Sequence, residues 1–174
     1  MGRSIPADTR PVWLLDVDGV LNAHHPGWDR PSCSGFARAL GGHFRITWAP
    51  QVVEALWALD DRVEVRWATT WVDWIDQIER LLGLPAWPPA FAHDGSPAVG
   101  AHRAKLAAAL GVIEGECRPL IWTDDDAIPE DARTVRRLTT GRAPALLIRP
   151  HPAKGLQPEH LAAIERFVAG CEAG

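Results

Sequence analysis

Short apolar runs alternate along the chain with segments of helical periodicity. Four runs have the length and composition of strands, and they lie at residues 11–15, 63–68, 119–122 and 145–149. Apolar residues at helical spacing, with proline or glycine near several of the ends, predict helices at residues 50–59, 72–82, 101–110 and 158–169. Such an alternation predicts an α/β fold with a central, mostly parallel sheet covered by helices on both faces.

Two segments interrupt this alternation. Residues 23–47 are rich in His, Pro, Gly and Ser, and we interpret them as an irregular excursion or flap, with a hairpin that ends at 44–47. The proline-rich segment 84–99 is expected to be a loop with a short strand near 90–92. Because the flap is too short to be a domain of its own, we expect a single domain over residues 1–174.

Composition and charge exclude several classes of protein. The chain has 174 residues and a net charge of −4, with its basic residues spread along it, so a nucleic-acid surface is possible but not favoured. No apolar run approaches the roughly 20 residues that cross a bilayer, so we expect a cytoplasmic protein outside the membrane. Cys33, Cys117 and Cys171 lack paired spacing, which argues against disulfides and zinc.

Tryptophan is unusually common, with nine residues against four phenylalanines and no tyrosine. Trp57, Trp67 and Trp122 lie in patterned apolar segments, so we expect these three rings to pack in the core.

Polar residues follow the predicted strands at the positions where function is usual in parallel sheets. In such sheets, functional groups gather where the carboxyl ends of the strands meet the following loops. The residues at these places are Asp16 and Asp18, Thr69 and Thr70, and Asp124 and Asp125. We therefore expect these side chains to form one site.

Two carboxylates two residues apart suit a two-step displacement. A carboxylate such as Asp16 can act as a nucleophile and form an acyl-phosphate, and Asp18 can protonate the leaving alcohol and later activate water. Clustered carboxylates repel one another and a phosphate, so the site needs a cation. Mg²⁺ fits because it prefers hard oxygen ligands, and either Asp124 or Asp125 would complete its coordination.

Further residues supply groups for the phosphate. Thr69 offers a hydroxyl and a backbone N–H, and Thr70 follows it at the same strand end. Lys105, one of two lysines in the chain, would order Asp16 and offset charge on the transferring group.

Each of these features has an ordinary structural interpretation when taken alone. The sequence Asp-x-Asp-Gly occurs in many turns, and the acidic triple at 124–126 is typical of a solvated loop. Thr69 is a suitable helix cap, and Lys105 suits an exposed position on a helix. Their joint order at the ends of consecutive predicted strands favours a functional site.

These motifs together resemble the haloacid dehalogenase (HAD) superfamily of aspartate-nucleophile hydrolases. Residues 16–22 look like its first motif, and Thr69 looks like its second. Lys105 looks like the third motif, for which Arg103 is the alternative, and residues 124–125 look like the fourth. The resemblance implies a Rossmann-like three-layer sandwich, Mg²⁺, an aspartyl-phosphate intermediate and a metal contact from the backbone carbonyl of Asp18. It also implies phosphatase or phosphomutase chemistry, because the second acidic residue of the first motif is present.

The segment 67–71 (Trp-Ala-Thr-Thr-Trp) is similar to a capless subgroup related to the HAD domain of the Swiss Army Knife RNA repair proteins. The chain has no room for a large cap, so we expect an open site. We expect the flap to contact the substrate through His24, His25, Trp28 and Arg30. The alternative is that the flap is an ordinary polar surface loop.

Three functions are therefore weighed. The first is a Mg²⁺-dependent phosphatase that acts on a small-molecule or macromolecular phosphate ester. The second is a polynucleotide 3′- or 5′-end phosphatase, suggested by the subgroup resemblance and opposed by the charge of −4. The third is a catalytically silent module that binds a phosphate or a partner.

Overall fold

A four-stranded parallel sheet forms the centre of the molecule. The computed structural model describes residues 9–92 and 98–173. The strands are β1 (Val12–Leu15), β4 (Glu64–Trp67), β5 (Leu120–Thr123) and β6 (Ala145–Ile148). They lie in the order β4-β1-β5-β6, and every neighbouring pair is parallel. The predicted α/β fold with a parallel sheet is confirmed, and each strand lies within two residues of its predicted position.

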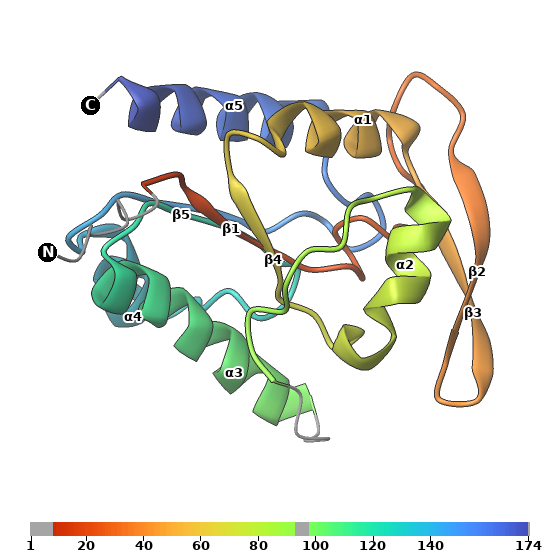
Figure 1. Ribbon diagram of the computed structural model, residues 1–174, viewed down its shortest axis with the longest axis horizontal. Coiled ribbons are helices and arrows are strands. Elements are labelled where there is room, and N and C mark those ends of the chain that lie inside the picture. The colour runs from red at the N-terminus through yellow and green to blue at the C-terminus, as the bar shows by residue number, and fades with distance from the viewer. Residues whose placement is uncertain (1–8, 93–97, 174) are drawn as a thin grey trace, which may run out of the picture.

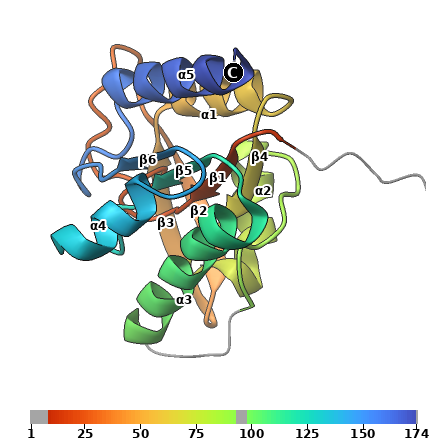
Figure 2. The same cartoon turned by 90° about the vertical axis from the view of Figure 1, so that its left-hand side faces the viewer.

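Helices cover both faces of this sheet (Figures 1 and 2). The helices α1 (Pro50–Leu59) and α5 (Pro158–Glu172) lie on one face, and α3 (Ala98–Leu110) and α4 (Ala132–Thr139) lie on the other. Successive side chains of a strand point to opposite faces, so β1 contributes to both cores. Trp13 and Leu15 pack with α1 and α5, whereas Val12 and Leu14 pack against the α3 and α4 side.

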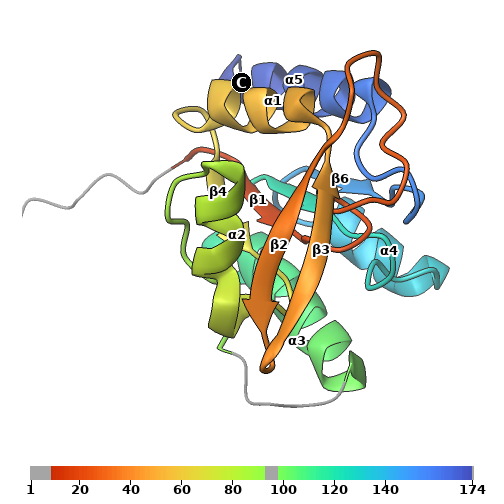
Figure 3. The same ribbon diagram turned by 90° about the vertical axis from the view of Figure 1, so that its right-hand side faces the viewer.

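The predicted flap contains an antiparallel hairpin of β2 (Cys33–Ala39) and β3 (Gly42–Trp48). Its two-residue turn, Leu40 and Gly41, has φ values of 50° and 75°, as expected for the tight turns that suit twisted hairpins. The hairpin runs beside α2 (Ile75–Leu82), which follows a single 3₁₀ turn at Val72–Trp74 (Figure 3). A hairpin was predicted here, but it is longer than expected because it begins at Cys33.

Helix α4 and a π-helical segment at Gly111–Glu116, directly after α3, were not predicted, and one predicted strand is not formed. Helix α4 spans only about two turns, its apolar positions are set among arginines and threonines, and Leu138 is its one buried residue. Asp131 caps it by accepting the Thr134 N–H at 2.9 Å. The strand expected near 90–92 is reduced to an isolated bridge between Trp67 and Pro89, where proline offers no N–H to a ladder. Residues 93–97 of that predicted loop lie outside the described residues.

The prediction for the tryptophans was right for two residues and wrong for one. Trp67 and Trp122 are fully buried, but Trp57 is 52% exposed. The Trp57 ring lies along the outside of α1, where its Nε1 donates to the Gly83 carbonyl at 3.1 Å. A ring that can cover surface and satisfy its N–H does not need to enter the core.

Two further features concern cysteines and membranes. Cys33, Cys117 and Cys171 are all free thiols. Over the described ranges 9–92 and 98–173, no helix combines the length and the apolar composition required to cross a bilayer.

Candidate active site

Three neighbouring strand ends bring the predicted site residues together. β4, β1 and β5 are adjacent and parallel, and Leu15 pairs with both Trp67 and Thr123. The residues that follow β1 and β5, Asp16 and Asp124, therefore lie at the same edge of the sheet.

Lys105 bridges these two carboxylates. Its Nζ donates to Asp16 Oδ2 at 2.6 Å and to Asp124 Oδ2 at 2.7 Å. Asp16 is 6%, Asp124 0% and Lys105 5% exposed, so the three charges lie almost entirely out of water. Lys105 comes from α3, on which Arg103 faces solvent, so Lys105 rather than Arg103 reaches the carboxylates.

Burial dominates the electrostatics of this group. It raises the pKa of Asp16 to about 7, an effect that Lys105 opposes and Asp124 reinforces. Burial alone would lower the pKa of Lys105, but the negative charges of Asp16 and Asp124 raise it above its usual value. The lysine therefore stays charged and compensates the carboxylates.

A third carboxylate lies beside the pair. Asp16, Asp124 and Asp125 each offer an oxygen, and these oxygens lie within 4.8 Å of one another. Gly19 has a φ of +67°, and a Cβ there would lie 2.3 Å from the Asp125 carboxyl group, so glycine permits this close approach. Burial and then Asp124 raise the pKa of Asp125. Carboxylate oxygens at this spacing suit a hard cation, so these residues fit Mg²⁺.

The Asp18 side chain lies outside this three-carboxylate group. Its Oδ1 accepts a hydrogen bond from Asn22 Nδ2 at 2.7 Å, and its Oδ2 accepts one from Trp71 Nε1 at 2.8 Å. Asn22 also accepts the backbone N–H of Thr47 on β3 at 2.9 Å, so the first loop is tied to the hairpin. Two donors thus fix the orientation of the Asp18 carboxylate.

A cavity of about 260 Å³ opens beside these groups. It is lined by Asp16, Asp18, Thr70, His102, Lys105 and Asp125, among others. Thr69 is fully buried, and its Oγ1 accepts the backbone N–H of Trp71 at 3.3 Å, a bond typical of local turns. Thr70 is exposed and lines the cavity, so it is the threonine that reaches the open space.

The flap residues singled out in the sequence divide into two pairs. Trp28 donates its indole N–H to a backbone carbonyl just before α5 at 2.8 Å, and Arg30 forms an ion pair with a glutamate of α1 at 2.6 Å. Both side chains are therefore bonded to the scaffold. His24 and His25 are exposed and line a polar cavity beside Asn22.

Two residues of the site were missed from the sequence. Trp71 holds Asp18, and it directly follows the Thr69-Thr70 pair. His102 lines the cavity and forms a contact of 3.0 Å with Asp126. Its position three residues before Lys105, on the same face of a helix, was a signal for it.

The fold and the site together define an α/β protein with an acidic, lysine-bridged cavity at the carboxyl edge of its sheet. No protein-family model matches the sequence, and a search of curated proteins found no match. The site is therefore interpreted from its own geometry and chemistry.

Proposed function

We propose that the chain is a Mg²⁺-dependent phosphatase that hydrolyses a phosphate monoester through an aspartyl-phosphate on Asp16. The observation that carries this proposal is the buried bridge from Lys105 to Asp16 and Asp124, with Asp125 close by. A lysine and a cation at one place offset the charges of the carboxylates and of the phosphoryl group that meets them.

In the first half-reaction, a carboxylate oxygen of Asp16 attacks the phosphorus atom. The ester P–O bond breaks with its electron pair on the leaving oxygen, which takes a proton from Asp18. In the second half-reaction, water attacks the phosphorus and gives a proton back to Asp18. The bond from Asp16 to phosphorus breaks, inorganic phosphate leaves, and both side chains regain their starting states.

The remaining residues bind and orient. Thr69, Thr70 and Lys105 are proposed to bind the phosphoryl oxygens through hydroxyl, backbone and ammonium donors. The proposed metal ligands are carboxylate oxygens of Asp16 and of Asp124 or Asp125, with the Asp18 backbone carbonyl. When bound, Mg²⁺ supplies positive charge that offsets the phosphate and the neighbouring carboxylates.

The resemblance to the HAD superfamily supports this proposal, because Asp16, Lys105 and Asp125, which resemble parts of its first, third and fourth motifs, line the cavity, and Thr69, which resembles its second, directly precedes Thr70 of the cavity wall. On the same grounds we propose that the sheet and its helices form a Rossmann-like, HAD-type sandwich without a large cap. The substrate would be a small-molecule or macromolecular phosphate ester, and the proposed location is the cytoplasm.

The replacement Asp16→Asn tests the proposal. Phosphate release from an aryl phosphate is measured with Mg²⁺ and with EDTA, and the circular dichroism spectrum checks the fold. We expect a loss of at least about 10³-fold in kcat, as is usual when a nucleophile is removed, and loss of wild-type activity with EDTA. The matched control is Asp126→Asn, which changes the same charge outside the three-carboxylate group. Retained turnover in Asp16→Asn would disprove the nucleophile.

A polynucleotide end phosphatase is the second candidate, and one observation favours it. A polar cavity of about 430 Å³ adjoins the first loop and is lined by His24, His25 and Arg45 together with Asn22. Such groups suit a second phosphate of a nucleic-acid strand. Faster turnover of 3′- or 5′-phosphorylated oligonucleotides than of mononucleotides, with KM rising steeply with salt, would favour this candidate.

A catalytically silent binding module makes the opposite prediction. The wild-type protein would then bind phosphate or a phosphorylated ligand, but it would release no phosphate from any ester with Mg²⁺ present.

A further inference from the structure

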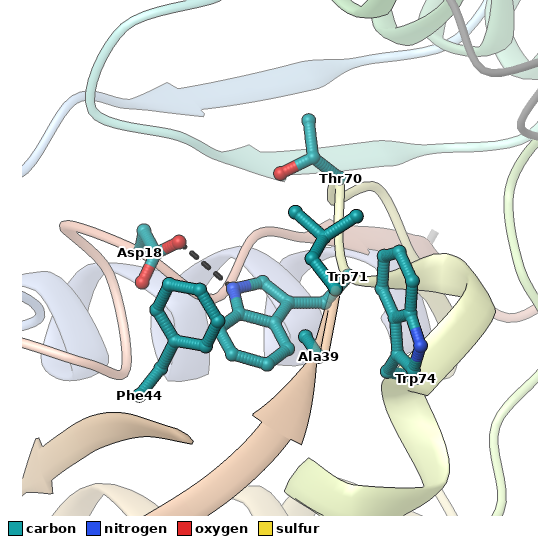
Figure 4. A pocket seen from close by; sticks show the side chains of 7 residues that line it. Asp18, Ala39, Phe44, Thr70, Trp71 and Trp74 are labelled. Atoms are coloured by element: carbon teal, nitrogen blue, oxygen red, sulfur yellow. Dashed lines mark hydrogen bonds between the residues drawn. The ribbon is translucent and has the colours of Figure 1, made fainter. Parts of the chain in front are cut away.

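A second, mainly apolar cavity adjoins the candidate active site. It has a volume of about 330 Å³, at the lower end of the range for small-molecule sites. Its walls are Ala39, Leu40 and Phe44 of the hairpin and Trp71 and Trp74 from the segment after β4 (Figure 4). Asp18 and Thr70 line this cavity and also the catalytic one, so the two cavities are adjacent and share part of their walls.

The aromatic walls are organised around the proposed acid. The ring of Phe44 meets that of Trp71 edge to face, with centroids 5.7 Å apart and an interplanar angle of 87°. The Nε1 of the same Trp71 donates to Asp18 at 2.8 Å, as the dashed line in Figure 4 shows. One indole thus forms a wall of the cavity and orients the carboxylate that would protonate the leaving group.

The hairpin side of this cavity is poorly explained by folding alone. Leu40 is 78% and Phe44 is 42% exposed, although the hairpin has already buried Ala37, Ala39 and Ile46 in the core. Leu40 also has a φ of 50°, which the two-residue turn requires and which glycine and asparagine adopt more easily. Exposed apolar side chains that gather beside a candidate site are typical of ligand contacts.

We propose that this apolar cavity binds the leaving group of the substrate, and that this group carries a planar aromatic ring. The proposal rests on the proposed function, because Asp18 must contact the ester oxygen in order to protonate it. The atoms beyond that oxygen then lie in the cavity that Asp18 shares with Phe44 and Trp74. A polyhydroxylated sugar would bury hydroxyl groups against these rings, whereas an aromatic ring would pack on them.

The test compares benzyl phosphate with n-propyl phosphate, whose leaving alcohols have similar basicity and differ in the ring. In the wild-type protein we expect a higher kcat/KM for the benzyl ester. Phe44→Ala should lower the benzyl-to-propyl ratio of kcat/KM about 3- to 10-fold, mainly through KM. The matched control is Phe36→Ala, because Phe36 is an exposed phenylalanine on the same hairpin outside the cavity walls.

The replacement Leu40→Asn distinguishes loss of an apolar contact with the leaving group from loss of stability of the fold. Asparagine accepts the positive φ of this turn more easily than leucine, so the melting temperature should not fall. The benzyl-to-propyl ratio should nevertheless fall at least about 2-fold, because an apolar wall is lost. A ratio that stays at the wild-type value in both Leu40→Asn and Phe44→Ala would overturn the aromatic leaving group.

Binding of the non-hydrolysable benzylphosphonate and n-propylphosphonate, measured by calorimetry, distinguishes failure of this inference from failure of the proposed function. Tighter binding of the benzyl compound that is lost in Phe44→Ala supports the aromatic cavity even without turnover. Equal binding of the two compounds, with Asp16-dependent hydrolysis of both esters, would disprove the aromatic leaving group and would still support the proposed phosphatase.

Discussion

Asp16, Lys105 and Asp124 are three charges in a place from which water is almost excluded. Charges interact more strongly in such surroundings, and a buried charge without its partner is costly. An apolar group of the same size would serve the core as well, so folding gives little reason for this arrangement. Strongly perturbed carboxylates beside a cavity are instead typical of functional sites.

At the residue scale, Trp71 is predicted to position Asp18. Trp71→Phe keeps a ring beside Phe44 but removes the N–H that donates to Asp18 at 2.8 Å. Loss of one hydrogen bond to a charged group should lower kcat for benzyl phosphate about tenfold. Kinetics with 4-nitrophenyl phosphate provide a second measurement, because its leaving group needs little protonation and its kcat should fall less than about threefold.

Trp74→Phe is the matched control for this prediction. It changes an indole in the same cavity without removing the donor to Asp18, so any effect should be similar for the two esters. Equal losses for both esters in Trp71→Phe would mean that Trp71 supports the cavity walls but does not position the acid.

The sequence predicted the members of the site better than their contacts. Asp16 and Asp124 were identifiable because each directly follows a buried strand, and Lys105 because it is a rare cation in the helix before β5. The bond between Trp71 and Asp18 joins residues 53 positions apart, and it depends on how two loops pack. Such a contact has no periodic signature along the chain.

At the scale of elements, predictions succeeded where burial imposes a period. The four strands are short apolar runs, and α1, α2 and α5 each carry a detectable apolar face, whereas α3 buries Lys105 between Ala101 and Ala109. Helix α4 was missed because it spans only about two turns and its few apolar positions are set among arginines and threonines. Trp57 was misplaced because pattern alone does not distinguish a ring in the core from one that covers the surface of its helix.

An ion-pair network at the amino ends of β4 and β5 is predicted to make stability depend on pH. Arg66 donates to Glu64 at 2.7 Å and to Glu116 at 2.6 Å. Partial burial alone would raise the pKa of Glu64, but hydrogen bonds from Arg66 and Arg118 lower this pKa below its usual value of 4.5. The pKa of Glu116 is also lowered, chiefly by the hydrogen bond from Arg66. Their stabilisation is therefore present above about pH 4.5 and lost as the pH falls through the lowered values.

Arg66→Met tests this network by chemical denaturation at several pH values. We expect the free energy of unfolding at pH 7 to fall by about 1 kcal/mol, a modest value because these groups are partly exposed. The difference from the wild-type protein should shrink towards zero near pH 3. Arg30→Met, which removes a more exposed pair with Glu54, is the control and should change stability less at every pH. A pH-independent loss in Arg66→Met would point to packing of its stem instead.

At the scale of the whole molecule, the two ends of the sheet have different roles. The amino ends of β4 and β5 carry the Arg66 network, and the carboxyl ends carry the carboxylates and the cavities. Stability and proposed chemistry are thus separated by the length of the strands. The hairpin and the segment after β4 border the edge that carries the carboxylates, where the sequence had predicted an open site.

Because the three carboxylates come from two strand ends, a cation that joins them should stabilise the whole fold. If Mg²⁺ binds the folded chain and not the unfolded one, it raises the free energy of unfolding by about 2.7 kcal/mol at a concentration of 100 times its Kd. For a chain of this length that corresponds to a rise of roughly 5–10 °C in the melting temperature. Thermal denaturation in a Mg²⁺ titration, at constant ionic strength set with NaCl, measures this rise directly.

Asp125→Asn separates coordination from general screening of charge. This residue is partly exposed, and its pKa is raised by burial and by Asp124, so the neutral side chain should be tolerated without Mg²⁺. The Mg²⁺-dependent rise should fall to less than half of the wild-type value, because one ligand has lost its charge. Asp126→Asn removes the same charge one residue away, outside the three-carboxylate group, and should keep most of the rise. Equal effects of the two replacements would show that Mg²⁺ screens the acidic loop and is not held by Asp16, Asp124 and Asp125.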